Sequence, residues 1–379
     1  MTLLGTVCRR STLAAPLLAV LLASCADSGA TVKLGLAGPF TDPVGAPMKL
    51  AAELAVEEIN SAGGIAGRKV ELVERDDRGD PDSAVAIAAE LYAAGVVAVV
   101  GDVFSGTTLA AAPIYNGGRD PVVQISPASS APEVTDAGDY TFRVCPSDLA
   151  HGTQLARWAH DHLKLGRGAV LYLNDDYGWG IRKTFVEEFT RLQGEIVELD
   201  PYLGDKPAVG PYFDRLARRQ SAQFVLVAGN RSEAEEALRQ ARSRGLRMPF
   251  LGGDGLEGIE EAGALAEGTY VSAAYLPGIG TPKNRQFVQA YHQKYPSAGA
   301  PNQPAAATYD AIYLLRDVVR RTGTRRRAVR DGVAAVGSSA PAFEGVTGTI
   351  AFDRNGDVPG QRVIIGVVHS GAVQPAEGQ

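Results

Sequence analysis

The sequence has few cysteines, few aromatic residues and no excess of basic charge. Only Cys8, Cys25 and Cys145 occur among 379 residues, so neither a zinc ribbon nor a disulfide framework can be assembled. Aromatic residues make up 7% of the chain and hydrophobic residues 45%, which is typical of a globular protein. With 37 basic and 43 acidic residues the net charge is −6, so electrostatic binding of nucleic acid is not expected.

Motifs for nucleotide binding, hydrolysis and metal binding are also lacking. No G-x-G-x-x-G, P-loop or Gly-x-Ser-x-Gly pattern occurs, although these motifs mark common nucleotide and hydrolase sites. His160 and His162 form the only histidine cluster. Residues two apart on a helix point to different faces, so chelation there is not expected. No catalytic residue, metal or cofactor is therefore predicted.

The N-terminus has the features of an export signal. Arg9 and Arg10 precede an apolar run over residues 13–23, which is shorter than the ~20 residues that span a bilayer. Residues 1–24 are thus predicted to be a signal peptide. Leu22-Ala23-Ser24-Cys25 is similar to a bacterial lipobox, which implies lipidation of Cys25 and a lipidated tether over residues 25–31. A plain signal peptide with a coincidental cysteine is the alternative.

The remaining chain alternates between strand-like and helix-like segments in two series. In the first series, strands are expected near 32–37, 69–74, 96–100 and 122–125, with helices of 10–15 residues between them. The second series begins after Cys145. Such alternation predicts parallel sheets covered by helices on both faces, and the length also favours two domains. The predicted fold class is therefore α/β with two lobes.

Several ordered stretches together resemble the type I periplasmic binding proteins, specifically the branched-chain amino-acid (leucine/isoleucine/valine-binding) receptors of ABC transporters. The resemblance covers about residues 31–370. The stretches that carry it are Glu58–Lys69 with Asp76-Asp77, Gly101–Thr108, Gln124–Glu133, Phe142–Val144, Asp175–Gly178 and Gly252–Gly255.

The resemblance implies two Rossmann-like lobes joined by three hinge crossings and closing on a ligand. We place the crossings near Cys145, Ala274 and Gly348. The first lobe then comprises residues 32–144 and 275–347, and the second comprises residues 145–274 and 348–379.

Two serine-containing segments are expected to meet at one edge of the first sheet, because each follows a predicted strand. Ser105 begins a helix, and Ser130 closes the segment Ser126–Ser130. By resemblance, Ser105 and Ser130 hold the α-carboxylate of a ligand and the Ala128 carbonyl faces its ammonium group. The neighbouring candidate site residues are Phe104 and Ser129. The alternative is a helix-capping Ser105 and an ordinary turn serine at 130.

The second lobe is expected to contribute an acid and an aromatic ring. Asp254 follows a predicted strand in Gly-Gly-Asp-Gly, where the family commonly has an acidic residue that pairs with the ligand ammonium. Tyr177, after another strand, would cover the ligand. A simple turn aspartate is the alternative for Asp254.

The side-chain pocket departs from the family pattern. Val44 and Asn230 stand where the family often has aromatic residues, and the positions of an occasional disulfide are Gly79 and Phe104. A ligand larger or more polar than leucine is consistent with these changes. Val44 and Asn230 are counted among the candidate ligand-binding residues.

The sequence thus predicts a monomeric, membrane-tethered receptor in the periplasm or at the cell-envelope surface that delivers an amino acid to an ABC permease. A receptor or sensor of the same fold for an amide, urea or carboxylate is the alternative. An exported enzyme is disfavoured, because the adjacent acids Asp76-Asp77 would point oppositely on a strand and no nucleophile accompanies them.

Overall fold

The computed structural model describes Thr2, residues 31–203 and residues 208–378. The expected signal peptide and the lipidation residue Cys25 lie outside the described residues. No helix in the described part of the chain is long and apolar enough to cross a membrane.

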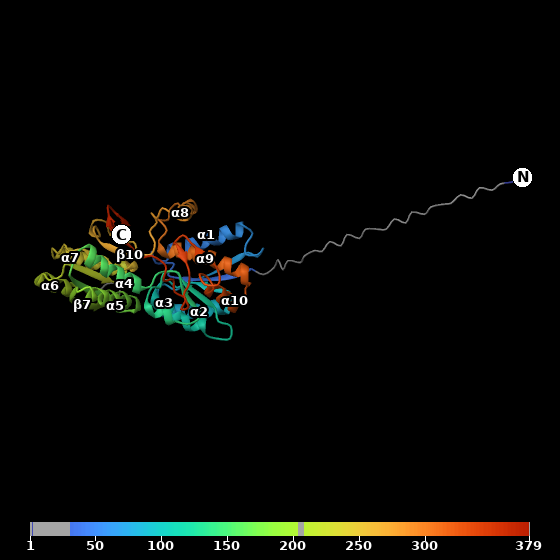
Figure 1. Ribbon diagram of the computed structural model, residues 1–379, viewed down its shortest axis with the longest axis horizontal. Helices are drawn as coiled ribbons and strands as arrows, with labels where there is room; N and C mark the ends of the chain where they lie inside the picture. The colour runs from blue at the N-terminus through green and yellow to red at the C-terminus, as the bar shows by residue number, and fades with distance from the viewer. Residues whose placement is uncertain (1, 3–30, 204–207, 379) are drawn as a thin grey trace.

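The first lobe is built on a five-stranded parallel sheet with the order β2-β1-β3-β4-β5. The strands are β1 (Val32–Gly38), β2 (Val70–Asp76), β3 (Ala98–Val100), β4 (Val123–Ser126) and β5 (Thr141–Arg143). The other elements are α1 (Ala46–Ser61), α2 (Pro81–Ala93), α3 (Ser105–Asn116), η1 (Pro132–Asp136), α8 (Pro282–Lys294), α9 (Gln303–Thr322), α10 (Arg326–Ala334), β11 (Phe343–Glu344) and β12 (Thr349–Ile350). Helices α1, α9 and α10 cover one face of the sheet, and α2 and α3 cover the other (Figure 1). Both faces are therefore buried, which explains the continuous apolar runs in the strands.

The second lobe has a seven-stranded sheet with the order β14-β13-β10-β9-β8-β6-β7. The strands are β6 (Arg167–Leu173), β7 (Glu195–Tyr202), β8 (Phe224–Ala228), β9 (Phe250–Gly252), β10 (Tyr270–Ala273), β13 (Ile364–His369) and β14 (Ala372–Pro375). The other elements are α4 (Asp148–Arg157), η2 (Trp158–His162), α5 (Asp176–Arg191), α6 (Gly210–Arg219), α7 (Arg231–Ser243), η3 (Asp254–Leu256) and η4 (Ile259–Leu265). Helices α4 and α5 pack on one face, and α6 and α7 on the other.

The two sheets share one topology. In each, the first strand of the lobe lies second from one edge, the second strand forms that edge, and the next three strands follow in order on the other side. The prediction of two α/β lobes with parallel central sheets is confirmed, with antiparallel β13 and β14 added at one edge of the second sheet. In this topology ligands bind beyond the carboxyl ends of the strands, where the order reverses.

The chain passes between the lobes three times. The core residues change lobe after Val144 and near Ala274, so the first two crossings lie there. The third crossing lies between Val358 and Ile364, so the predicted position near Gly348 is wrong. Val358 and Phe352 belong to the first-lobe core, and the Phe352 ring meets Phe142 edge-on with the ring centroids 5.2 Å apart. This packing keeps the chain in the first lobe for about ten residues longer.

Candidate functional site

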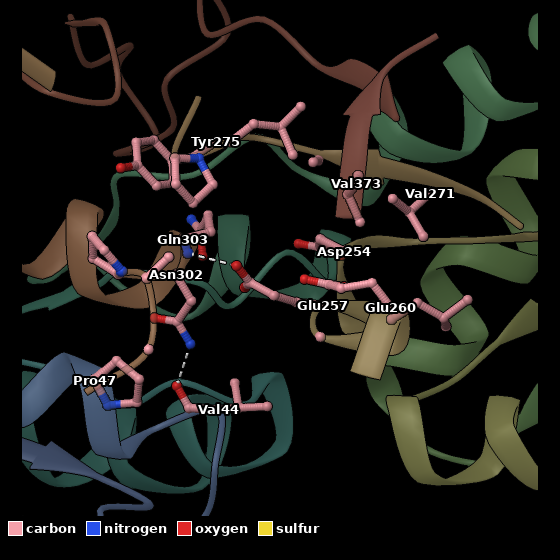
Figure 2. Close-up of a pocket in the computed structure, with 18 of the residues that line it drawn as sticks. Val44, Pro47, Asp254, Glu257, Glu260, Val271, Tyr275, Asn302, Gln303 and Val373 are labelled. Atoms are coloured by element: carbon pink, nitrogen blue, oxygen red, sulfur yellow. Dashed lines mark hydrogen bonds between the residues drawn. The ribbon is translucent and has the colours of Figure 1, made fainter. Parts of the chain in front are cut away.

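A cavity of about 720 Å³ opens between the lobes, beside the second crossing. Figure 2 shows its walls. Carboxyl side chains of the second lobe, from Asp254, Glu257 and Glu260, converge on one side, and Asn302 and Gln303 face them from the start of α9. Apolar residues, among them Val44, Pro47 and Tyr275, complete the first-lobe side. The cavity therefore has one acidic wall and one mostly apolar wall.

Asp254 lies at the end of this cavity, in the turn that follows β9. Its Oδ1 accepts a hydrogen bond from the Tyr177 hydroxyl at 3.0 Å, and that hydroxyl accepts one from the Gly255 N–H at 2.7 Å. Its Oδ2 lies 3.6 Å from Nε2 of His151. The Asp254 side chain is 11% exposed and lines the cavity, and it accepts its hydrogen bond from the neutral Tyr177 hydroxyl. Tyr177 therefore lies beside Asp254.

The serine segments meet at the carboxyl edge of the first sheet. Ser105 is the first residue of α3, and its buried Oγ accepts a hydrogen bond from the Ala131 N–H at 3.2 Å. Phe104 occupies the N-cap position without a side-chain cap bond, so Ser105 does not act as a helix cap. The Ser130 hydroxyl is buried with no hydrogen-bond partner among the described residues. The two hydroxyls lie near the start of α3. The N–H groups in the first turn of this helix have no acceptors within the helix, so they are also available to a ligand.

Ser129 plays a different part in this segment. Its hydroxyl shares a 2.7 Å hydrogen bond with the Thr108 hydroxyl and donates to the Val103 carbonyl at 3.1 Å. The side chain is fully used inside the protein and fastens the serine segment to α3. Ala128 is partly buried against the first-lobe core.

Arg143 holds the same segment from below. Its buried guanidinium donates to the carbonyls of Ser130 at 3.0 Å and Ala131 at 2.8 Å, and it pairs with Asp357 at 2.7 Å. A buried arginine with carbonyl and carboxylate partners fixes backbone geometry, because every donor direction is used. In the sequence, Arg143 belongs to the stretch Phe142–Val144 that carries the family resemblance, but no local pattern predicts its role.

The comparisons with known proteins agree with this geometry. The family model "Periplasmic binding protein" matches residues 31–372. A leucine-, isoleucine-, valine-, threonine- and alanine-binding protein of Pseudomonas aeruginosa is 32% identical over 345 residues, covering 89% of each chain. The chain belongs to the type I periplasmic binding proteins of the branched-chain amino-acid family.

Solved structures of the family have the same fold. A branched-chain amino acid transporter substrate-binding protein of Streptococcus pneumoniae, in complex with isoleucine, is 27% identical with a TM-score of 0.82, covering 92% of this chain and 99% of its own. A substrate-binding protein of Desulfitobacterium hafniense in complex with leucine is 29% identical with a TM-score of 0.78, covering 92% and 100%. This periplasmic binding protein is therefore a substrate-binding protein of an ABC transport system outside the cytoplasm and not an enzyme.

Asp148 is a buried acid between Ser130 of the first lobe and Asp254 of the second lobe of this binding protein. The Asp148 N–H, at the start of α4, donates to the Ser130 carbonyl at 2.8 Å. Its carboxyl is fully buried, and burial raises its pKa well above the usual range, with the nearby Asp254 charge adding to the effect. Asp148 was not singled out from the sequence, because a helix-start aspartate is common on any surface.

Gln303 joins the lobes across the cavity. Its backbone N–H donates to the Glu257 carboxyl at 2.7 Å, and its side-chain amide donates to the Pro127 carbonyl at 2.8 Å (Figure 2). Burial raises the pKa of Glu257 to about 8, and the charges of Asp254 and Glu260 contribute. The Asn-Gln-Pro start of α9 predicts a helix N-terminus, but nothing in the sequence places it against the second lobe.

The remaining candidate residues lie around the site at different depths. Val44 lines the cavity, and its carbonyl accepts from the Asn302 amide at 2.8 Å. The Phe104 ring packs on the first-lobe core, where a Cβ on Gly79 would lie 2.9 Å from it. Asn230 is the N-cap residue of α7, next to the Asp254 turn but not among the residues lining the cavity.

Metal-binding groups are not found in the described ranges, 31–203 and 208–378. No set of three or more His, Cys, Asp or Glu side chains there is arranged to hold an ion.

Proposed function

We propose that this protein captures an L-amino acid of the branched-chain type, or a larger aliphatic relative, between its two lobes. The observation that carries the proposal is the Asp254 carboxylate, which lines the cavity, accepts a hydrogen bond from the Tyr177 hydroxyl and has Nε2 of His151 3.6 Å away. A carboxylate in that position suits an ammonium group, because a desolvated charge pair is favourable and either charge left alone is costly.

The opposite end of a zwitterion would bind at the first lobe. Ser105 and the unpartnered Ser130 hydroxyl supply hydroxyl groups, and the start of α3 supplies N–H groups and the positive end of the helix dipole. Together with the Ala128 carbonyl facing the ammonium group, these groups complement the backbone atoms of any amino acid. Tyr177 would cover the ligand from the second lobe.

The side chain of the ligand would extend into the cavity along its apolar wall. Val44 and Pro47 line that wall, and the Pseudomonas relative is named for binding leucine, isoleucine, valine, threonine and alanine. Val44 contributes no aromatic ring to that wall, so the compartment would accept side chains larger than that of leucine.

The setting of this activity follows from the sequence and the family. We propose lipidation of Cys25, attachment to a membrane through residues 25–31, and delivery of the ligand by the monomer to an ABC permease. A Cys25→Ser variant would then leave the membrane fraction for the soluble fraction, whereas a protein released by ordinary signal cleavage would be soluble in both forms.

A thermal-shift screen followed by calorimetry tests the ligand class. Ligands that bind only the folded state raise the melting temperature by mass action. We expect L-leucine, L-isoleucine or L-valine to raise it, and Asp254→Asn to abolish the shift while the unliganded protein melts near the wild-type temperature. Leucinamide and the 2-hydroxy acid analogue of leucine complete the screen. If only the amide or the hydroxy acid binds, the alternative receptor for amides or carboxylates is correct.

A further inference from the structure

His151 is a buried histidine that lies directly behind Asp254. It is located on α4, with no exposed surface. Its Nδ1 lies 3.0 Å from the Ser272 hydroxyl on β10, and its Nε2 lies 3.6 Å from Oδ2 of Asp254. Nε2 has no hydrogen-bond partner among the described residues. A buried polar nitrogen without a hydrogen-bond partner destabilises the folded state. The orientation of Nε2 toward Asp254 therefore points to a role in the site.

The surroundings of the ring select one tautomer. Nε2 faces a carboxylate oxygen, which only accepts, so this contact favours a proton on Nε2. Nδ1 then accepts from the Ser272 hydroxyl, which can donate. Burial lowers the pKa of His151, and the positive charge of Arg143 opposes protonation, whereas the Asp254 charge favours it. The ring is consequently a neutral donor aimed at Asp254.

We infer that His151 is a positioning residue, which orients the Asp254 carboxylate so that its free lone pairs meet the ammonium group of the ligand. This inference rests on the proposed function. Tyr177 holds Oδ1, so the carboxylate can still rotate about that contact. A donor at His151 restricts this rotation from the Oδ2 side, and the 3.6 Å separation closes to a hydrogen bond with a small rotation of the carboxylate.

If His151 positions Asp254, replacing His151 should reduce affinity only for ligands that carry an ammonium group. Hydrogen bonds to charged groups are strong enough that His151→Leu should weaken L-leucine binding about tenfold. The same variant should bind the 2-hydroxy acid analogue of leucine with nearly unchanged affinity, because that ligand lacks the ammonium group. His151→Gln retains a donor and should restore most of the affinity for L-leucine. His292→Leu, at an exposed histidine of α8, is the matched control.

Calorimetry with both ligands, with melting temperatures of all variants, separates the outcomes. Equal losses for L-leucine and its hydroxy analogue would mean that His151 is only a packing residue and would overturn the inference. Wild-type affinity in His151→Leu would overturn it as well. If wild-type protein binds neither L-leucine nor any other amino acid, the proposed function itself has failed, and the inference fails with it. If His151→Leu does not fold, the comparison of His151→Gln with wild type decides, since Gln must keep the preference for the amine over the hydroxy acid.

Discussion

The two lobes contribute to the site in contrasting ways. The first lobe presents hydroxyl and backbone groups that are fastened by internal hydrogen bonds, above all those of Ser129 and Arg143. The second lobe presents carboxyl groups with few partners, and burial raises the pKa of Glu257. A cradle fixed by hydrogen bonds therefore faces an acidic wall in which the raised pKa of Glu257 makes the charge of that side chain depend on pH. This difference suggests that recognition of the ligand carboxylate is preorganised, whereas recognition of the ammonium depends on electrostatics in the cleft.

The largest loss of stability is expected when the hydrogen bonds of Arg143 in the first lobe are removed. Arg143→Leu leaves the Asp357 carboxylate and two carbonyls without their partner, and breaking a buried pair costs about 3–5 kcal/mol. Urea denaturation should show this loss in the free energy of unfolding. Arg75→Leu, which removes an exposed ion pair with Glu90, is the control and should cost about 1 kcal/mol or less. Equal losses would contradict the view that Arg143 organises the first-lobe cradle.

A smaller, pH-dependent change in stability is expected when Glu257 in the second lobe is replaced. The pKa of Glu257 rises from 4.5 to about 8 on folding, so between these pH values the folded state holds a proton that the unfolded chain releases. Glu257 thus lowers the free energy of unfolding progressively as pH rises from 4.5 to 8. Glu257→Gln keeps an acceptor for the Gln303 N–H and should stabilise the protein by about 2 kcal/mol at pH 8 and hardly at pH 4.5.

Chemical denaturation of this variant at several pH values checks the prediction. Glu187→Gln, at an exposed position of α5, should show no such pH-dependent gain. A gain that is the same at pH 4.5 and pH 8 would show that folding does not raise the pKa of Glu257.

The smallest changes are expected from replacing Ser129 and Ser130, two neighbouring serines of the first lobe with different hydrogen bonding. The Ser130 hydroxyl has no partner within the described chain, whereas the Ser129 hydroxyl has several. Ser130→Ala should therefore weaken binding of the amino acid by about 1 kcal/mol with little change in stability, and Ser129→Ala should lower stability by about 1 kcal/mol. Calorimetry and denaturation of the two variants measure both quantities. Reversed outcomes would assign the ligand contact to Ser129.

Much of the arrangement could be predicted from the alternation of strands and helices. Segments that follow parallel strands meet at one edge of the sheet, which is why Ser105 and Ser130 were expected together and why Asp254 and Tyr177 were both expected at the ligand-binding edge of the second lobe. The third crossing could not be predicted this way. It depends on Phe352 packing against Phe142, a contact between segments about two hundred residues apart.

Local sequence patterns also could not identify the residues that contact and orient the binding groups. His151 and Asp148 lie at ordinary helix positions, and Gln303 begins a helix far along the chain. Their roles arise only when α4, β10 and α9 come together around the Asp254 turn.

Hydrophobic periodicity and turn residues act locally, so the sequence was enough to predict the two-lobe α/β architecture, the export and the edge at which a ligand would bind. Which buried groups have partners and which do not could be learned only from the folded chain. Hydrogen bonding and burial depend on neighbours that are distant in sequence, and these interactions separate a fastened Ser129 from an unpartnered Ser130 and aim His151 at Asp254.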